Sequence, residues 1–427
     1  MKRRAGVGLW LVLAAAGCAA PKPPPAPAPA APPPSPIPPA ANADTAAARE
    51  DSLARAKRAR RVRAPVRLAF VGDINLGTMT LPGGVPPDSG RALLRAAKPF
   101  LTGDLVVGNF EGVLADSGET TKCAKKRSVA WATSPAALKR APPKVDSVPP
   151  PTRRHHPRTH PKPKPEPVRC YAFLTPAFLA ARLSEAGFTH LNLANNHAND
   201  FGLDGRRSTD SILASLGLDT YGPLGRVAID TVRRGDASTI VGIVGFTTYP
   251  FAYDLLDIPR SVAVVDSIRP LVDLLVVTFH GGAEGSDALH LPFAAESLGH
   301  EQRGELRAWA HAVVDAGADL VVGHGPHVLR GIEMWQGRLI AYSLGNFVTY
   351  RGFNLAGPQG LTGVLDVEFA ANGHLARARL HPMRQGPLQG PAPDPEQSAA
   401  RLVRALSTDD FGGSAARIDN DGTIGPP

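Results

Sequence analysis

The stretch ADLVVGHGPH, residues 318–327, joins an apolar run to two histidines and shows a pattern that recurs along the chain. Its first half is short and apolar, which is typical of a strand buried on both faces. His324 and His327 follow, three residues apart around a Gly-Pro turn, a spacing that lets both rings face one cation. The stretch therefore predicts a buried strand that ends in metal-ligand side chains.

Further apolar runs predict more buried strands, and helical patterns lie between them. The strands are expected at 66–72, 104–109, 189–195, 239–246, 273–280 and 339–346, and the helices at 89–99, 176–187, 204–217 and 301–316. Residues 361–382 resemble an antiparallel hairpin that turns at Asn372 and Gly373. Because strands alternate with helices, the sequence predicts an α/β sheet with crossover connections.

Nearly every predicted strand ends in side chains of metal-ligand type. The candidate ligands are Asp73, Asn75, Glu111, Asn196, His280, His324 and His327. In open α/β sheets the ligand site lies at the carboxyl ends of the strands, so these side chains are expected to meet there. Each one has a structural alternative when taken alone: Asp73 and Asn75 suit a turn, Glu111 suits a helix N-terminus, and His280 suits a core. Together, these oxygen and imidazole ligands predict a divalent metal centre.

His197 is the candidate catalytic residue. It lies in ANNHAND, residues 194–200, where Asp200 follows closely enough to orient its imidazole. Two bound cations could lower the pKa of a bridging water and polarise a substrate oxygen, while His197 serves as a general acid. The alternative is an ordinary polar loop. No GxSxG elbow, P-loop or complete dinucleotide fingerprint is present in the sequence.

The positive charge of the chain lies outside the predicted core. The 427 residues have a net charge of +9, but residues 1–64 contribute +8 and residues 116–170 contribute +9, so the remainder has a net charge of −8. Both basic segments are rich in proline and poor in aromatic residues, which is not typical of a surface that reads nucleic acid. We therefore expect no nucleic-acid partner. The second segment could hold an anionic polymer by counterion release, or it could be a flexible spacer.

The N-terminus predicts export. Residues 1–18 read MKRRAGVGLWLVLAAAGC, with a positive start, a short apolar run and small residues before Cys18. This layout resembles a lipoprotein signal peptide in which Cys18 is lipidated, and cleavage without lipidation is the alternative. The predicted location is a membrane-anchored lipoprotein, periplasmic or at the cell surface, followed by a Pro/Ala-rich and then basic linker at 19–64.

Cys123 and Cys170 remain once Cys18 is set aside. In an oxidising compartment an even number of cysteines favours a disulfide, and two free thiols are the alternative. The pair flanks a basic, proline-dense insert at about 124–169. The predicted domain spans 65–390 with this insert inside it, and residues 391–427 are predicted to form a partly disordered tail with a short helix near 396–406.

Six ordered motifs resemble one known family. They are FVGDINLG, VGNFEGVL, LNLANNHANDFG, VVTFHGGAE, VVGHGPHVLRGIE and IAYSLGNFV. Over roughly residues 66–385 the chain is similar to the CapA family of capsule (poly-γ-glutamate) biosynthesis proteins. The resemblance implies a metallophosphatase-like fold, related to calcineurin-like phosphoesterases: a four-layer α/β/β/α sandwich in a single catalytic-type domain.

The resemblance also implies a role for each candidate ligand. Asp73 with Asn75 corresponds to the first metal motif, Glu111 with Asn109 to the second, Asn196 with His197 to the Asn-His motif, His280 to the lone histidine, and His324 with His327 to the Gly-His-x-His motif. Two divalent ions, chosen among Mn, Fe, Zn and Mg, are expected there. Asn75 replaces the usual histidine and Glu111 the usual bridging aspartate, which shifts the site toward hard oxygen ligands.

Two functions are compatible with these features. The first is an envelope-anchored, metal-dependent hydrolase of phosphoester or amide bonds that acts in capsule or poly-γ-glutamate-type polymer synthesis. The second is a non-catalytic polymer-binding or assembly subunit with a structural metal site. The expected partners are an anionic polymer or a small-molecule substrate, the membrane through the lipid anchor, and polymer synthase or export proteins.

Overall fold

The structure is a computed structural model that describes residues 62–120, 122, 127–130 and 171–427. All of these residues belong to one compact unit, 57–427. The predicted signal peptide, the lipidation site Cys18, the predicted disulfide between Cys123 and Cys170 and most of the basic insert lie outside the described residues. In the part of the chain that is described, no helix combines the length and the apolar character needed to cross a bilayer.

The first sheet is built around β1, Val66–Asn75. The strands β2 (Leu105–Phe110), β7 (His190–Asn192) and β8 (Asp219–Tyr221) continue from it in parallel. On its other side, β19 (Leu361–Phe369), β20 (Leu375–Arg384), β23 (Thr423–Gly425) and β22 (Arg417–Ile418) pair antiparallel. The end of β1 also pairs in parallel with β18 (Asn346–Thr349), and β20 pairs with β21 (Ala392–Pro393). The predicted hairpin over 361–382 is confirmed as β19 and β20.

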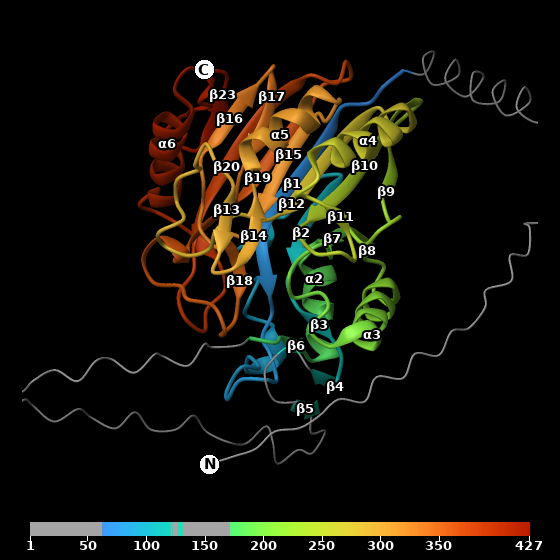
Figure 1. Cartoon of the computed structure of the whole chain (residues 1–427), viewed down its shortest axis with the longest axis vertical. Helices are drawn as coiled ribbons and strands as arrows, with labels where there is room; N and C mark the ends of the chain where they lie inside the picture. The colour runs from blue at the N-terminus through green and yellow to red at the C-terminus, as the bar shows by residue number, and fades with distance from the viewer. Residues whose placement is uncertain (1–61, 121, 123–126, 131–170) are drawn as a thin grey trace, which may run out of the picture. The chain divides into compact units, whose positions relative to one another are not determined.

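The second sheet has a parallel centre (Figure 1). Its strands β10 (Ala237–Thr247), β12 (Leu274–His280), β15 (Leu320–His324) and β17 (Arg338–Ala341) run in the same direction. At the edges, β16 (Ile332–Trp335) and β9 (Ala228–Arg234) pair antiparallel, and the short β11 (Tyr253–Asp254) pairs in parallel with β10. Smaller two-stranded pairs join β3 (Val113–Leu114) to β6 (Leu174–Thr175), β4 (Ser117–Thr120) to β5 (Arg127–Ala130), and β13 (Glu296–Leu298) to β14 (Glu301–Gly304).

The two sheets pack face to face because their strands are apolar on both faces. In β1, Val66, Leu68 and Phe70 lie in a core shared with β10, β12, β15 and β17. The alternate residues Ala69 and Val71 lie in a different core, on the outer face of the first sheet. This two-residue alternation is what a strand between two apolar layers requires.

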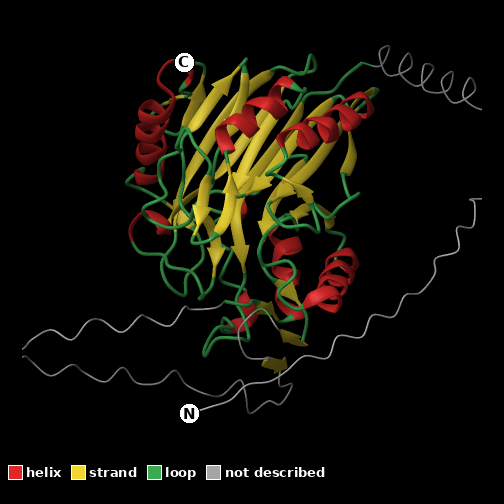
Figure 2. Ribbon diagram, viewed as in Figure 1, coloured by secondary structure: helices red, strands yellow, loops and turns green. Residues whose placement is uncertain are grey.

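Helices cover the outer faces (Figure 2). The 3-10 turn Ala177–Ala180 with α2 (Ala181–Ala186), and α3 (Gly202–Ser215), pack on the first sheet, whereas α4 (Ile258–Ile268) and α5 (Leu306–Asp315) pack on the second. Helix α6 (Ser398–Phe411) contributes Ala399 and Val403 to the core between the sheets. The layers are therefore α/β/β/α, and the predicted fold class is confirmed.

Three segments differ from the sequence predictions. The helix predicted over 89–99 is absent: residues 91–97 form turns between two short 3-10 helices, Asp88–Gly90 and Lys98–Phe100. Gly90 has a positive φ of 72° and Pro99 lacks an amide hydrogen, so neither favours a continuous α-helix. The predicted helix over 301–316 begins at Leu306, because Gly304 has a φ of 94° and ends strand β14. In the tail, the helix predicted near 396–406 is present as α6, but the remainder, predicted to be disordered, forms β22 and β23, because Ile418 and Ile424 are buried in the core between the sheets.

Candidate metal centre

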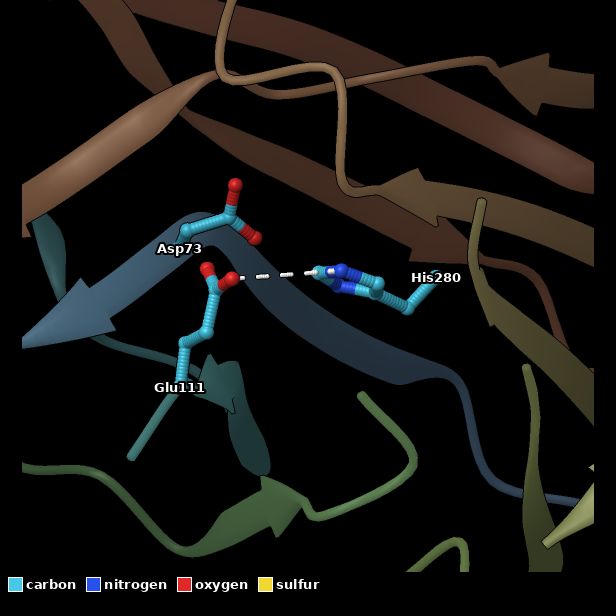
Figure 3. Close-up of side chains that lie close together, drawn as sticks. All are labelled: Asp73, Glu111 and His280. Carbon is cyan, nitrogen blue, oxygen red and sulfur yellow. Dashed lines mark ion pairs between the residues drawn. The ribbon is translucent and has the colours of Figure 1, made fainter. Parts of the chain in front are cut away.

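Side chains from both sheets meet at the carboxyl ends of their parallel strands. Asp73 lies near the end of β1, Glu111 directly follows β2, and His280 ends β12. The ligand atoms of these three side chains all lie within 4.8 Å of one another, and the three residues are fully buried (Figure 3). His324 pairs with His280 across β12 and β15 and so arrives at the same place. The predicted convergence of strand ends is therefore present.

Glu111 is a buried carboxylate without a hydrogen bond. Neither of its side-chain oxygens has a hydrogen-bond partner among the described residues. Its Oε1 atom lies 3.9 Å from Nε2 of His197, 3.9 Å from Nε2 of His280 and 3.7 Å from Nε2 of His327. Burial raises the pKa of Glu111 well above its usual value, because a desolvated carboxylate disfavours its charged form.

Asp73 is held ionised by histidines. Its Oδ2 atom lies 2.9 Å from Nδ1 of His327, and its Oδ1 atom lies 3.6 Å from Nδ1 of His324. Burial alone would raise the pKa of Asp73, but these two rings outweigh it and hold the pKa far below its usual value. Burial also opposes the charged form of His327, yet Glu111 and Asp73 raise its pKa to about 10. The centre thus places acidic and imidazole groups in mutual contact.

Asn109 fixes the orientation of the ligands between the sheets. Its Nδ2 atom donates to Oδ1 of Asp73 at 2.9 Å and lies 3.3 Å from Nδ1 of His280. Its Oδ1 atom accepts hydrogen bonds from Asn192 and Asn195 at 3.0 and 3.1 Å. Because Nδ1 of His280 contacts the amide, Nε2 is left facing Glu111 without a hydrogen-bond partner in the described structure. Burial lowers the pKa of His280 well below its usual value, because a desolvated imidazolium is disfavoured.

The backbone approaches closely where β1 and β15 reach the centre. A Cβ atom on Gly72 would lie 1.9 Å from the carbonyl oxygen of Gly345, and one on Gly323 would lie 2.2 Å from that of Tyr342. Both glycines directly precede a site residue, so these contacts set the positions of Asp73 and His324. His327 has a φ of 58°, in the left-handed region that non-glycine residues rarely adopt. Such strain is typical of functional sites.

His197 is oriented by a carboxylate and a lysine. Its Nδ1 atom lies 2.6 Å from Oδ2 of Asp200, which also accepts a hydrogen bond from the backbone of Phe173. Lys122 contacts both side chains, with its Nζ atom 3.1 Å from Nδ1 of His197 and 2.5 Å from Oδ1 of Asp200. The proximity of Asp200 that the sequence suggested is present. Burial lowers the pKa of His197, against the opposing effect of Asp200.

The two predicted asparagine ligands lie in different environments. Oδ1 of Asn196 is buried and has no hydrogen-bond partner in the described part of the chain. In contrast, the amide of Asn75 donates to the carbonyl of Glu111 at 2.8 Å and accepts from the backbone of Gly77 at 3.1 Å. Asn75 therefore ties β1 to the segment after β2 through its side-chain amide.

The predicted ligand set does not include several neighbours of the centre. Glu284 lies 3.8 Å from Nε2 of His327 and receives a 2.9 Å hydrogen bond from the buried Arg303. Asn346 is buried and paired with Asp73 across β18, and its Oδ1 atom has no partner among the described residues. Glu284 follows His280 by four residues, which is a usable signal. Asn346 ends the predicted strand 339–346 and carries the same strand-end signal. Arg303 carries none, because only the folded chain brings it near.

The unpartnered atoms provide a test of whether a metal fits. A buried polar atom without a hydrogen bond costs about 1–3 kcal/mol, so several in one place need a compensating partner. Here they are both oxygens of Glu111, Nε2 of His280 and Nδ1 of His324. Oδ1 of Asn196, the residue before His197, is likewise buried and unpartnered. Carboxylate, amide and imidazole atoms are all ligands of divalent cations. The residues present therefore fit a divalent metal ion.

The fold and the centre define a class: an α/β sandwich with metal-ligand side chains at the strand ends. Residues 158–351 match the family model described as bacterial capsule synthesis protein PGA_cap. The resemblance of the chain to the CapA family is thereby confirmed. The chain is a relative of capsule and polyglutamate synthesis proteins.

Individual relatives agree with this family. The PGA biosynthesis protein CapA of Bacillus subtilis (strain 168) is 32% identical over 185 residues, which cover 40% of this chain and 45% of the relative. The capsule biosynthesis protein CapA of Bacillus anthracis is 31% identical over 188 residues, covering 40% and 42%. A probable polyglutamine synthesis accessory protein of Mycobacterium tuberculosis is 28% identical over 248 residues, covering 51% and 58%. The chain thus spans about half the length of these relatives.

Solved structures show a more distant likeness. The 5'-nucleotidase precursor of Thermus thermophilus aligns with a TM-score of 0.37 and 15% identity, covering 81% of this chain and 59% of that one. A putative 5'-nucleotidase of Staphylococcus aureus aligns with a TM-score of 0.34 and 14% identity, covering 53% and 43%. Both TM-scores are low, so the fold class rests on the strand order and layers of this chain.

Proposed function

We propose that this chain is a metal-dependent hydrolase of the cell envelope that acts in the synthesis of a capsule or poly-γ-glutamate-type polymer. One observation carries the catalytic part of the proposal: unpartnered ligand atoms of Glu111, His280 and His324 gather at the strand ends beside His197. The match to capsule synthesis proteins supports the biological setting.

The proposed metal ligands are the side chains at the centre. Asp73, Glu111, Asn196, His280, His324 and His327 would hold two divalent ions. When bound, such ions supply Lewis acidity and a more acidic water. Asn109 keeps Asp73 and His280 in fixed orientations, so the ligands are organised before substrate arrives.

His197 is the proposed proton-transfer residue. The short contact with Asp200 favours a proton on Nδ1, which leaves Nε2 turned toward the centre, 3.9 Å from Glu111. Nε2, unprotonated in the neutral ring, can take the proton that the attacking water gives up and pass it to the leaving group, while Asp200 holds the ring in place. The positive charge of Lys122 offsets the negative charge of Asp200, and Lys122 also contacts the ring of His197.

The location and partners form the remaining part of the proposal. The layout of residues 1–18 supports export and anchoring through Cys18. An anionic polymer or a small acidic molecule is the proposed substrate, and synthase or export proteins are the proposed partners.

The test is hydrolysis by the purified chain with defined metal content. Wild-type protein, His197→Ala and the control His374→Ala, at an exposed position, are assayed on a generic phosphodiester and on γ-glutamyl peptides. We expect His197→Ala to lose about 10²–10⁴-fold in rate while it retains its metal, and His374→Ala to match the wild type.

A non-catalytic outcome has a distinct signature. If metal-loaded wild type hydrolyses neither kind of substrate and His197→Ala leaves polymer production unchanged in cells, the hydrolase proposal is wrong. The site would then be a structural metal centre in a polymer-binding or assembly subunit.

A further inference from the structure

A pocket of about 210 Å³ lies beside helix α3, outside the ligand set of the metal centre. One face of α3 lines it, because residues three, four and seven positions apart share a side of a helix. The lining residues on this face are Leu203, Arg206, Arg207 and Asp210. The rest of the wall comes from Gly112, Leu193, Ala198, Thr209, Pro223 and Arg226.

The pocket adjoins the backbone of the metal centre. Gly112 directly follows Glu111, and Ala198 directly follows His197, so these two lining residues are each bonded to a residue of the centre. Leu193 begins the same loop after β7 that carries Asn196. A molecule in this pocket would therefore contact the segments that hold both the metal-ligand carboxylate and the proton-transfer histidine.

Arg206 is the cation best placed to bind an anion there. Its guanidinium carbon lies 5.3 Å from the centre of the Phe251 ring, so the aromatic side chain holds the group through its face. Its Nε atom is buried and has no hydrogen-bond partner among the described residues. A guanidinium held by its face can still donate from its edge, and arginine donates to a carboxylate in a planar fork. The unpartnered Nε is one such donor of Arg206.

The other two arginines have different roles. Arg226 is neutralised by Asp210, with contacts of 2.5 and 3.0 Å between the guanidinium and the two carboxylate oxygens. Arg207 is 71% exposed at its side chain and lies 3.7 Å from Asp204, a weak surface contact. The lining therefore keeps an excess of positive charge, supplied by the half-buried Arg206 and the exposed Arg207.

The remaining wall is apolar and the pocket is small. Leu193, Ala198, Leu203 and Pro223 are among the lining residues, and Leu203 is 50% exposed. The volume is below the roughly 300–1,000 Å³ of pockets that hold drug-sized ligands. Apolar walls with one organised guanidinium suit a short aliphatic stem that ends in a carboxylate.

We propose that this pocket binds one acidic amino-acid unit, a carboxylate on a short aliphatic stem, and thereby positions an acidic chain beside the metal centre. The inference rests on the proposed function, because it names the part of the substrate that lies next to the reacting bond. The carboxylate pairs with Arg206, and the stem packs on Leu193 and Leu203.

Binding is tested by calorimetry on the full chain carrying Glu111→Gln, so that catalysis does not consume the ligand. The probes are a γ-linked glutamate trimer, free glutamate and inorganic phosphate. Arg206→Gln is added as the test variant, and Arg233→Gln, at an exposed position of β9, is the matched control. We expect Arg206→Gln to weaken trimer binding at least about tenfold and Arg233→Gln to leave it unchanged.

Each outcome decides the proposal. Trimer binding tighter than that of free glutamate supports a polymer as the source of the unit, and equal binding supports a free acidic metabolite. Unchanged binding in Arg206→Gln, or phosphate binding as tight as that of the trimer, overturns the proposal. These measurements need no turnover. If the protein proves inactive but binds the trimer in a way that depends on Arg206, the pocket proposal stands and only the hydrolase proposal is rejected.

Discussion

Among the described residues, Glu111 and Glu333 are both fully buried, yet they have opposite surroundings. Glu333, in strand β16, and Glu111, after β2, both have an exposed fraction of 0%. The carboxylate oxygens of Glu333 lie 2.6–3.0 Å from the donor atoms of four side chains: Arg307, His311, Tyr342 and Ser414. Glu111 has no hydrogen-bond partner for either oxygen among the described residues.

The two carboxyl groups consequently shift in opposite directions. Burial would raise the pKa of Glu333, but hydrogen bonds from His311, Ser414 and Tyr342 lower it to about 2. Burial dominates at Glu111 and raises its pKa well above the usual value. A buried carboxylate with partners stabilises the fold, whereas one without partners costs stability and is kept for a ligand.

The largest expected effect comes from Glu111→Gln. It should lower the affinity for divalent metal by more than about 100-fold, because it removes a charged oxygen at the middle of the ligand set. The metal-free protein should be about as stable as the wild type, because neither oxygen of Glu111 has a hydrogen-bond partner to lose. Metal titration and denaturant unfolding measure the two quantities. A drop in the unfolding free energy of the metal-free protein would show that Glu111, like Glu333, stabilises the fold.

Glu333→Gln should have the opposite profile. Its free energy of unfolding should fall by about 3 kcal/mol, because Arg307 and His311 lose a charged partner in a buried setting. Metal affinity should stay within a few-fold of the wild type. Urea unfolding of the metal-free proteins checks the first value, and a matching loss of metal would show that the two regions are not independent.

The stabilising effect of Glu333 should depend on pH. Its pKa is about 2 in the folded protein against an ordinary value of 4.5, so the folded state favours the ionised form. The stabilisation is fully present above about pH 4.5 and is lost as the pH falls through 2. The difference in unfolding free energy between the wild type and Glu333→Gln should shrink over that interval. A constant difference would mean that packing, and not charge, is responsible.

Asn75→Ala should have the smallest effect and decides between two roles. The amide of Asn75 bonds the backbone of Glu111 and Gly77, so its loss should cost about 1–2 kcal/mol of stability. If that is its main role, metal affinity should fall less than about tenfold. A loss of metal comparable to that of Glu111→Gln would show that Asn75 is a ligand, as the family resemblance implies.

The sequence predicts the centre well where a ligand directly follows a buried strand. Asp73, His280 and His324 end apolar runs, so the strand pattern alone brings them to one edge. The face-to-face packing of two sheets was implied only by the family resemblance, because apolar runs give no order of strands.

Other features depend on tertiary structure and could not be read from local pattern. Asn346 reaches Asp73 through the parallel pairing of β18 with a bulged β1. Arg303 lies in a short strand that the helical pattern concealed, and its charge is matched by Glu284 only after folding. The strands of the tail depend on two isoleucines, Ile418 and Ile424, in an otherwise polar segment.

The central claim is that the unpartnered atoms around Glu111 are metal ligands, and metal analysis tests it most directly. Wild type, Glu111→Gln and Glu333→Gln are purified in parallel and dialysed, and their Mn, Fe, Zn and Mg contents per chain are measured by mass spectrometry. We predict stoichiometric divalent metal in the wild type and in Glu333→Gln, and almost none in Glu111→Gln. Equal metal in all three proteins, or a folded wild type that binds no divalent metal, would contradict the claim.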